Sequence, residues 1–496
     1  GREKWIGPSN LGFANGYQGI YFAGWGAPGA LWGNVYNTKA DLRHFRGAHT
    51  MAFGFEYGNS QVYGDHGSCC SRGNFNFYNQ YTNDGFADFL LGYTSGRSRN
   101  APLAEFGTNS APYTGMYFND TYRVRDNITL DLGLRYERWY ARRNMRDATS
   151  TWDPNLQKVV AAVGGDGKIN MNAFLTTPNV AAATAGQWVT SRDAGYNDGL
   201  TEGNGNWAPR FGVVYRPFKQ KQIVLRGGYG IFYNSFTGNR SASSAANLPF
   251  WGVESLGFGL TQLQPWQTVW SSDPNAFGIF GMGEAVDPRI KAARTHNWNA
   301  TLQTALPWKS ALTLSYVGTK VANDVIMMPY NAAAIGPHSN LQADRPNPGI
   351  SSVTRMENYS RYWYHALQTK AERRFADGFL FTLSYSFSRS MGGPFGGSDE
   401  YGSLIPFSPD WYNRGRTDFD IRHIEYATVV WEMPVGQGRR YLADTNRAVD
   451  AILGGWEVGF TQQARDGAPL SVGGGYSNLG NGYGTRADII GSPSIS

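Results

Sequence analysis

Residues 117–137 read YFNDTYRVRDNITLDLGLRYE, and their second half decides the fold class. From position 128 onward, apolar and polar side chains alternate. The apolar row is Ile128, Leu130, Leu132, Leu134 and Tyr136. A period of two is typical of a β-strand with one apolar and one polar face. The preceding RDN at 125–127 is a turn sequence, so the stretch predicts a tight hairpin.

The same alternation recurs along the chain and predicts about a dozen strands. It is clear in 379–387 (FLFTLSYSF), where an aromatic or leucine side chain occupies every second position. The expected strands are residues 41–46, 49–59, 113–123, 128–140, 205–216, 222–234, 294–306, 311–320, 362–375, 379–390, 420–433 and 452–465. Many reach the length of about ten residues that a tilted strand needs to cross a bilayer. Strands of soluble sandwiches or propellers, the alternative fold, are usually nearer five or six residues.

The connections between these strands alternate between short and long. Tight turns are expected at 125–127, 217–221, 307–310 and 376–378, and long loops at 141–204, 235–293, 321–361 and 391–416. In an up-and-down meander all long loops emerge at one end, as in transmembrane barrels. We therefore expect an all-β, antiparallel transmembrane β-barrel with long extracellular loops.

Lipid offers no hydrogen bonds, so a spanning strand directs its polar side chains inward. The residues expected on the lipid-facing side include Leu130, Leu132, Trp298, Phe381 and Leu383. The lumen-facing candidates are Arg135, Glu137, Gln368, Lys370, Glu372 and Arg374. Two interpretations of this polar set remain open. It is either a wall that contacts a plug or substrate, or a ladder of charges that pair across strands in a wet interior.

The long loops are rich in tryptophan, which suits either of two roles. The candidates are Trp152, Trp188, Trp251, Trp266 and Trp270. A tryptophan ring provides rigid contact area with a polar edge and could bind a partner protein or glycan. Alternatively, the rings form small cores that keep the loops folded. Both interpretations predict ordered loops.

Composition excludes several other classes. The chain has 496 residues, with 63 Gly, 15% aromatic and only 17% charged residues. This aromatic content argues against disorder. The net charge is +6, but Lys and Arg are interspersed with acids, so no nucleic-acid footprint is expected. No run approaches the roughly 18 apolar residues of a membrane-spanning helix, which does not exclude barrel strands.

Motifs for catalysis are missing from the sequence. It contains no Gly-x-Ser-x-Gly, His-Glu-x-x-His or Walker-type loop, so we expect no enzyme, no cofactor and no metal site. Cys69 and Cys70 are adjacent and too few for zinc; a vicinal disulfide and a pair of thiols without a role both remain open. The Asn- and Asp-containing stretch 144–155 could bind calcium or be an ordinary polar loop, and its spacing is not that of an EF-hand.

Several segments also resemble a known family, in the family's order. They are 46–57 (RGAHTMAFGFEY), 86–92 (FADFLLG), 117–137, 207–215 (WAPRFGVVY), 225–233 (LRGGYGIFY), 364–375 (YHALQTKAERRF), 418–423 (DFDIRH) and 453–456 (LGGW). Together they resemble the β-barrel portion of Oar-like TonB-dependent outer-membrane receptors of acidobacterial and myxobacterial type. The resemblance extends over about residues 40–490.

The resemblance implies a barrel of about 22 strands around a plug in the bacterial outer membrane. It implies uptake of an unidentified solute, contact with outer-membrane lipid and lipopolysaccharide, and coupling to the TonB complex through a segment absent from this chain. The alternative is a structural or adhesive surface protein whose loops bind a partner protein or glycan. With about a dozen strands, the chain is expected to be a fragment of the mature protein. Its expected parts are an irregular segment at 1–40, barrel strands and loops at 41–475, and a final loop at 476–496 with the barrel end missing.

Overall fold

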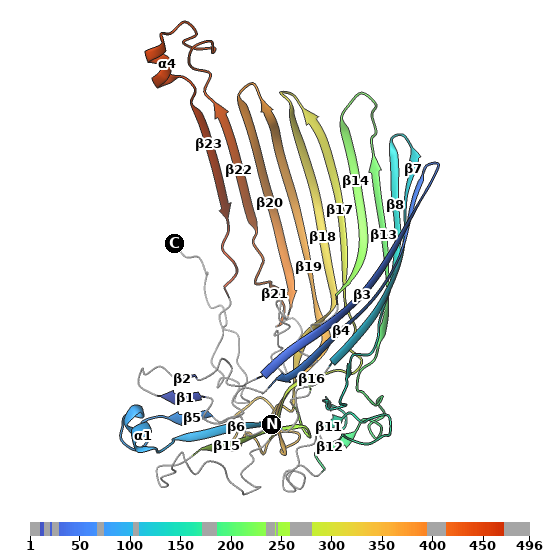
Figure 1. Cartoon of the computed structure of the whole chain (residues 1–496), viewed down its shortest axis with the longest axis vertical. Helices are drawn as coiled ribbons and strands as arrows, with labels where there is room; N and C mark the ends of the chain where they lie inside the picture. The colour runs from blue at the N-terminus through green and yellow to red at the C-terminus, as the bar shows by residue number, and fades with distance from the viewer. Residues whose placement is uncertain are drawn as a thin grey trace.

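The structure is a computed structural model that describes residues 10–13, 20–21, 29–66, 74–102, 109–170, 186–234, 244, 247–257, 280–393 and 413–470. One long antiparallel sheet dominates it (Figure 1). Twelve strands follow one another across this sheet in chain order. They are β3 (Gly29–Arg46), β4 (His49–His66), β7 (Asn109–Arg125), β8 (Ile128–Trp139), β13 (Asn204–Tyr215), β14 (Ile223–Asn234), β17 (Ala293–Leu306), β18 (Ser310–Tyr330), β19 (Ile350–Ala376), β20 (Phe379–Gly393), β22 (His423–Glu432) and β23 (Glu457–Arg465).

The expected all-β, antiparallel architecture and its twelve strands are confirmed, but three boundaries were wrong. The strand expected at 452–465 begins only at Glu457, because residues 447–453 form a helix. β3 begins at Gly29, so residues 29–40 are strand and not an irregular segment. Strands β18 and β19 continue their pairing past a register irregularity between Val321 and Asp324, as far as Tyr330. Only residues 331–349 of the expected loop 321–361 therefore lie between strands. Alternation could not reveal this extension, because the consecutive residues 325–327 are all buried.

The short and long connections lie at opposite ends of the sheet, as the sequence predicts. The short turns lie at one end, and the described parts of the long connections lie at the other (Figure 1). One connection at the turn end is longer: it carries the helix α4 (Arg447–Leu453), capped by the Asn446 side chain, which accepts from the N–H groups of Ala448 and Val449. No helix in the described residues is long and apolar enough to cross a membrane.

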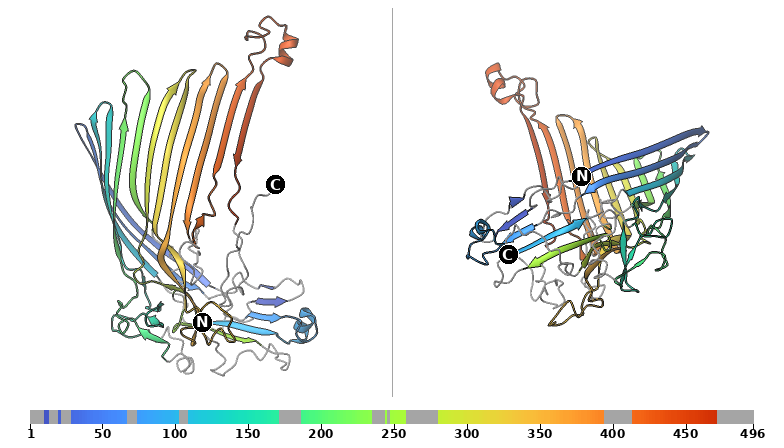
Figure 2. Two further views of the ribbon diagram at one scale, coloured as in Figure 1. Left: turned by 180° about the vertical axis from the view of Figure 1, so that it is seen from behind. Right: turned by 60° about the horizontal axis from the view of Figure 1, so that its bottom comes forward.

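The sheet is curved but open, with β3 and β23 as its two edges (Figures 1 and 2). Its cross-strand register places the two expected sets of side chains on opposite faces. On the apolar face Leu132 stands opposite Phe211, and Phe381 opposite Val429. On the polar face Lys370 stands opposite Ser384. Cross-strand neighbours of this kind stabilise a sheet face by face, and a slip of one residue would exchange the two faces.

Smaller layers of structure cover the loop end of the sheet (Figure 2). One is a five-stranded sheet of β15 (Trp251–Gly257), β6 (Gly96–Pro102), β5 (Asn74–Phe77), β1 (Asn10–Phe13) and β2 (Ile20–Tyr21), with helix α1 (Gly85–Leu91) beside it. The other is a three-stranded sheet of β10 (Ser150–Asp153), β11 (Lys158–Ala161) and β12 (Trp188–Thr190). The short strands β9 (Arg143–Asn144), β16 (Phe280–Val286) and β21 (Gly415–Arg416) add to the edges of β7, β19 and β20. Most fully buried apolar side chains lie in this region, because the long antiparallel sheet is a single layer and encloses no core.

The prediction that the apolar face of the long sheet meets lipid can be tested with a pair of adjacent residues on β20. Leu383→Arg would place a charge on the apolar face, and we expect it to lower the free energy of unfolding in lipid vesicles by about 2–4 kcal/mol. Thr382→Arg is the control, because Thr382 lies on the polar face opposite Glu372. Its effect should stay below about 1 kcal/mol. Equal losses for the two variants, measured by urea unfolding, would contradict the assignment.

Candidate functional site

A group of polar side chains spans four neighbouring strands on the polar face. We call it the β3–β8 cluster; its members are Asp41, Glu56, Tyr113, Tyr117, Arg135 and Glu137. The Arg135 Nε lies 2.5 Å from Glu137 Oε1, and its Nη2 lies 3.1 Å from Glu56 Oε2. The Tyr113 hydroxyl donates to Glu56. Glu56, Arg135 and Glu137 are therefore each held by a defined partner from their own or another strand.

Glycines on the intervening strands allow these long side chains to lie flat against the sheet. The close pairs are Gly54 with Tyr117, Gly58 with Tyr113, and Gly115 with Arg135. A Cβ at Gly54 would stand 2.0 Å from the Tyr117 ring, and only glycine leaves room for that ring. The Tyr117 hydroxyl passes over β4 in this way and donates to Asp41 on β3.

The predicted lumen-facing residues form two separate groups on the same face. Arg135 and Glu137 belong to the β3–β8 cluster. Lys370 and Glu372 pair with each other at 2.6 Å on β19, on the far side of β13, β14, β17 and β18. Gln368 stands opposite Ser315 and Ser386, which are both short polar side chains.

Arg374 differs from the other five candidates. It lies in the register irregularity between Arg373 and Ala376, next to the turn, so it has no defined position in the ladder. Sequence reasoning also missed Asp41, Glu56, Tyr113 and Tyr117. The signal that could have revealed Glu56 is its position between Gly54 and Gly58, because glycine at every fourth residue leaves space for side chains from the next strand.

A second organised region, the outer loop cap, joins two of the long connections to the loop-end parts of β18 and β19 around one buried cation. We define this cap as the described residues of 141–203, 280–292 and 321–361. Arg355 is 7% exposed and donates to Glu357 and, at 2.9 Å, to the carbonyl oxygen of Trp152. Its Nη2 also lies 3.8 Å from Asp287, and its guanidinium sits 5.3 Å from the ring centre of Tyr330. A buried charge is tolerated only when it is paired and hydrogen-bonded, and here its partners come from two long connections and from the loop-end parts of β18 and β19.

The loop tryptophans have different positions, and for Trp152 the structure favours the second of the two roles left open, that of a loop core. Trp152 is fully buried in a core with Val159 and Ile350, so its ring is not available to a partner and instead keeps the loops folded. Trp188 is half-buried and packs against the same core. For Trp251 only the strand backbone is described. Trp266, Trp270, Cys69 and Cys70 lie outside the described residues.

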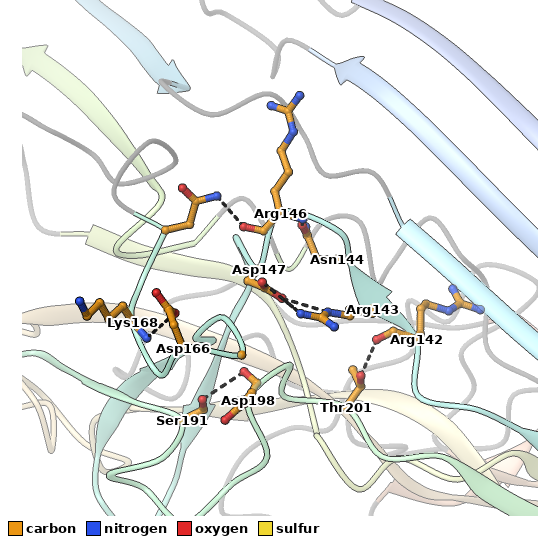
Figure 3. Close-up of polar contacts among 12 residues, drawn as sticks. Arg142, Arg143, Asn144, Arg146, Asp147, Asp166, Lys168, Ser191, Asp198 and Thr201 are labelled. Carbon is orange, nitrogen blue, oxygen red and sulfur yellow. Dashed lines mark hydrogen bonds and ion pairs between the residues drawn. The ribbon is translucent and has the colours of Figure 1, made fainter.

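Polar contacts hold the connection between β8 and β13 in shape (Figure 3). Arg143 pairs with Asp147 at 3.1 Å, and the Thr201 hydroxyl donates to the carbonyl of Arg142. Further contacts are the Lys168 N–H with Asp166, the Ser191 hydroxyl with the Asp198 carbonyl, and the Asn170 amide with the Arg146 carbonyl. In the described part of the chain the carboxylates do not gather into a group that could hold a metal ion.

Two further groups in the cap have altered acidities. Burial and a hydrogen bond to Asp153 raise the pKa of Tyr196 to about 12. His338, in the 331–349 connection, places Nε2 2.8 Å from the Ala334 carbonyl and Nδ1 2.8 Å from Asp344 Oδ2. These two acceptors raise the pKa of His338, because only the doubly protonated imidazolium can donate to both.

Comparison with known families assigns this chain to a family. A family model described as an outer membrane beta barrel domain matches residues 7–496, which is nearly the whole chain. The chain belongs to this outer-membrane β-barrel family. It is therefore a protein of the bacterial outer membrane.

At low identity, the chain is also similar to several solved structures. The FrpB iron transporter of Neisseria meningitidis is 13% identical with a TM-score of 0.39, over 82% of this chain and 42% of that one. The YddB transporter of Escherichia coli is 11% identical with a TM-score of 0.44, over 88% and 47%. FpvA of P. aeruginosa, bound to pyoverdine and iron, is 10% identical with a TM-score of 0.41, over 90% and 39%. The barrel thus spans less than half the length of these proteins, and no curated protein sequence matches it.

The ion pairs of Arg135 can be tested with a double-mutant cycle. Arg135→Gln leaves Glu56 and Glu137 without their cation, and we expect a loss of about 1–3 kcal/mol in the free energy of unfolding. Arg135→Gln with Glu137→Gln should cost less than the sum of the two single variants, because the partners are in contact. Arg226→Gln, an exposed arginine on the same face, is the control and should change stability by less than about 0.5 kcal/mol. Strict additivity would show that the pair contributes nothing.

The order of the 331–349 connection should depend on pH. The folded state raises the pKa of His338, so the stabilisation is complete below the ordinary value of about 6.5 and is lost as the pH rises through the raised pKa. Amide hydrogen exchange in residues 331–349 should therefore become faster on going from pH 6 to pH 8, after correction for intrinsic rates. His338→Gln should abolish this dependence. The same pH response in the variant would assign the effect to another group.

Proposed function

We propose that this barrel forms the wall of an Oar-like, TonB-dependent receptor that transports a solute across the outer membrane and is not an enzyme. The observation that carries the proposal is the combination of a continuous polar face with an ordered loop cap at one end of it. A polar inner wall accommodates water and solute, whereas a cap of cross-linked loops provides a rigid surface for capture. The ordered family motifs support the same function, and contact with the TonB complex would come from a segment outside this chain.

The open edges of the sheet support a larger barrel. The N–H and C=O groups along the outer edges of β3 and β23 need hydrogen-bond partners, which hydrocarbon cannot supply. We propose that further strands pair with both edges in the membrane and close a barrel of about 22 strands. The polar face then lines a lumen wide enough for a plug.

Within that lumen, the β3–β8 cluster is the candidate contact for the plug or for the passing solute. Glu56, Arg135 and Glu137 are held in place by one another and are still about one-fifth exposed. A preorganised set of charges of this kind can bind a polar partner without first losing side-chain freedom. Lys370 and Glu372 are more exposed and are better suited to a role as a solvated pair in the wall.

A structural or adhesive function remains the second candidate, and one observation favours it. Helix α1 exposes Phe86, Leu90 and Leu91, at 42%, 69% and 58%, on the small sheet at the loop end. Strand pairing between β6 and β15 joins this unit to another long connection. Such an apolar patch could hold a partner protein at the cell surface.

Uptake by cells separates the two functions. Cells with and without the full-length protein would be given a defined mixture of ferric chelates, oligosaccharides and peptides, with or without a protonophore. Transport predicts that at least one solute is depleted only when the protein and the proton gradient are both present. Replacing residues 235–293 with a short Gly/Ser linker should abolish that uptake while the barrel still assembles. Loss of surface adhesion with no effect on any solute would favour the structural function.

A further inference from the structure

The turn end of the long sheet, at the top of Figure 1, carries a concentration of positive charge. Three turns contribute to it: those between β3 and β4, between β7 and β8, and between β13 and β14. Together they hold five exposed cations, which are Arg46, Arg125, Arg216, Lys219 and Lys221. Asp126 is the one acid in residues 46–49, 125–128 and 216–222. We call the five cations the turn-end row; a soluble surface usually intersperses the two signs of charge more evenly.

Backbone hydrogen bonds hold the three turns side by side. The Arg123 N–H donates to the Ala48 carbonyl at 2.9 Å, and the Arg216 N–H donates to the Asn127 carbonyl at 2.9 Å. The strands that lead into the turns are paired in the order β3, β4, β7, β8, β13 and β14. Because neighbouring strands lie about 4.8 Å apart, successive turns are separated by roughly 10 Å. The cations are therefore spread along one edge of the sheet.

Other cations at the turn end are paired within the chain, unlike those of the row. Lys309 and Arg373 lie 3.8 and 3.1 Å from Asp377, and Arg439 lies 3.5 Å from Glu432. In the part of the chain that the structure describes, no ion pair joins a cation of the row to an acid. The row can therefore pair with the carboxylates of a separate molecule.

Two exposed aromatic rings accompany the row. Phe218 is 51% exposed, and Lys221 Nζ lies 5.5 Å from the centre of its ring. Trp308, in the next turn along the sheet, is 81% exposed. The φ of Trp308 is 59°, a conformation that asparagine or glycine adopts at lower cost than tryptophan. A strained backbone that presents an indole to solvent indicates a role in contact with a ligand.

We propose that the turn-end row, with Phe218 and Trp308, binds the glycan strands of peptidoglycan. The short turns of a transmembrane barrel face the periplasm, where this polymer lies beneath the outer membrane. Its stem peptides carry free carboxylates, which pair with arginine through two parallel hydrogen bonds and with lysine through its charge. The apolar face of a sugar ring stacks on an exposed aromatic ring. The site is separate from the proposed transport path and requires only that the turn end faces the periplasm.

The position of the row favours a polymer in the periplasm over the membrane itself. Strands β8, β13 and β14 each have 12 residues. At about 3.3 Å per residue and a tilt of about 45°, such a strand rises by roughly 28 Å, slightly more than the apolar band of about 25 Å. Lys219 and Lys221 follow the end of β13, so they lie beyond this band in water. There an extended strand of sugars and peptides can contact all three turns.

The test measures co-sedimentation of the purified full-length protein, held in phosphatidylcholine nanodiscs, with isolated peptidoglycan sacculi. The variant combines Arg46→Gln, Arg125→Gln, Arg216→Gln, Lys219→Gln and Lys221→Gln. We expect binding to be about 30- to 100-fold weaker, from roughly two- to two-and-a-half-fold for each exposed cation. A matched control removes five exposed cations at the loop end and should bind within about twofold of the parent. Its substitutions are Lys168→Gln, Lys291→Gln, Arg294→Gln, Lys320→Gln and Arg389→Gln.

A single substitution separates binding from folding. Trp308→Asn should leave the free energy of unfolding unchanged or higher, because asparagine adopts a positive φ more readily than tryptophan. Binding to sacculi should nevertheless fall about fivefold, because the stacking surface is lost. A Trp308→Asn protein that is less stable but binds as tightly as the parent would show that the ring anchors the barrel in the membrane.

Soluble competitors identify the chemistry that the row recognises. Muropeptides released by lysozyme should displace the protein from sacculi. Chitin oligosaccharides, which lack carboxylates, and polyglutamate, which lacks sugar, should each compete at least about tenfold less well. Displacement by polyglutamate as strong as by muropeptides would assign the row to acidic proteins, and stronger displacement by phosphatidylglycerol vesicles would assign it to phospholipid. Either result, or an equal loss of binding in the loop-end control, would overturn the proposal.

Discussion

Backbone hydrogen bonding inside the membrane is the constraint on which the rest of this structure depends. Hydrocarbon supplies no donors or acceptors, so every strand must satisfy its N–H and C=O groups on its neighbours. The outcome is a meander in which each of the twelve strands pairs with those next to it in sequence. A continuous ladder then fixes the register, and the register separates an apolar from a polar face.

On the polar face, glycine is as important as the charged residues. Tyr117 reaches Asp41 and Arg135 reaches Glu56 only because Gly54 and Gly115 leave the intervening surface bare. Side chains that cross a strand connect residues from β3 to β8 into one cluster. The same device occurs on the apolar face, where the Trp298 ring covers Gly318. In a wall one layer thick, such crossings provide the packing that a core provides elsewhere.

The loop end is stabilised by buried apolar side chains and a paired buried arginine, in addition to strand pairing. There the chain leaves the membrane and builds small apolar cores, with Trp152, Phe250 and Ile350 fully buried. Arg355 on β19 links two connections through one guanidinium, and removal of that charge from water is offset by Glu357, Asp287 and a carbonyl oxygen. A cap held in this way keeps the loop end of the sheet in one arrangement.

The amino-acid sequence by itself determined the strands, the turns and the two faces, because a period of two and a turn tripeptide are local properties. The strands expected at 128–140 and 379–390 are found at Ile128–Trp139 and Phe379–Gly393. The same locality limits what a sequence pattern can predict. Alternation does not predict the extension of β18 to Tyr330, because residues of that extension are buried on both faces. Only the tertiary structure decided that Arg135 meets Glu56, a residue 79 positions away, and that Trp152 serves a core. Such contacts depend on how strands and loops distant in sequence are brought together, which no local pattern encodes.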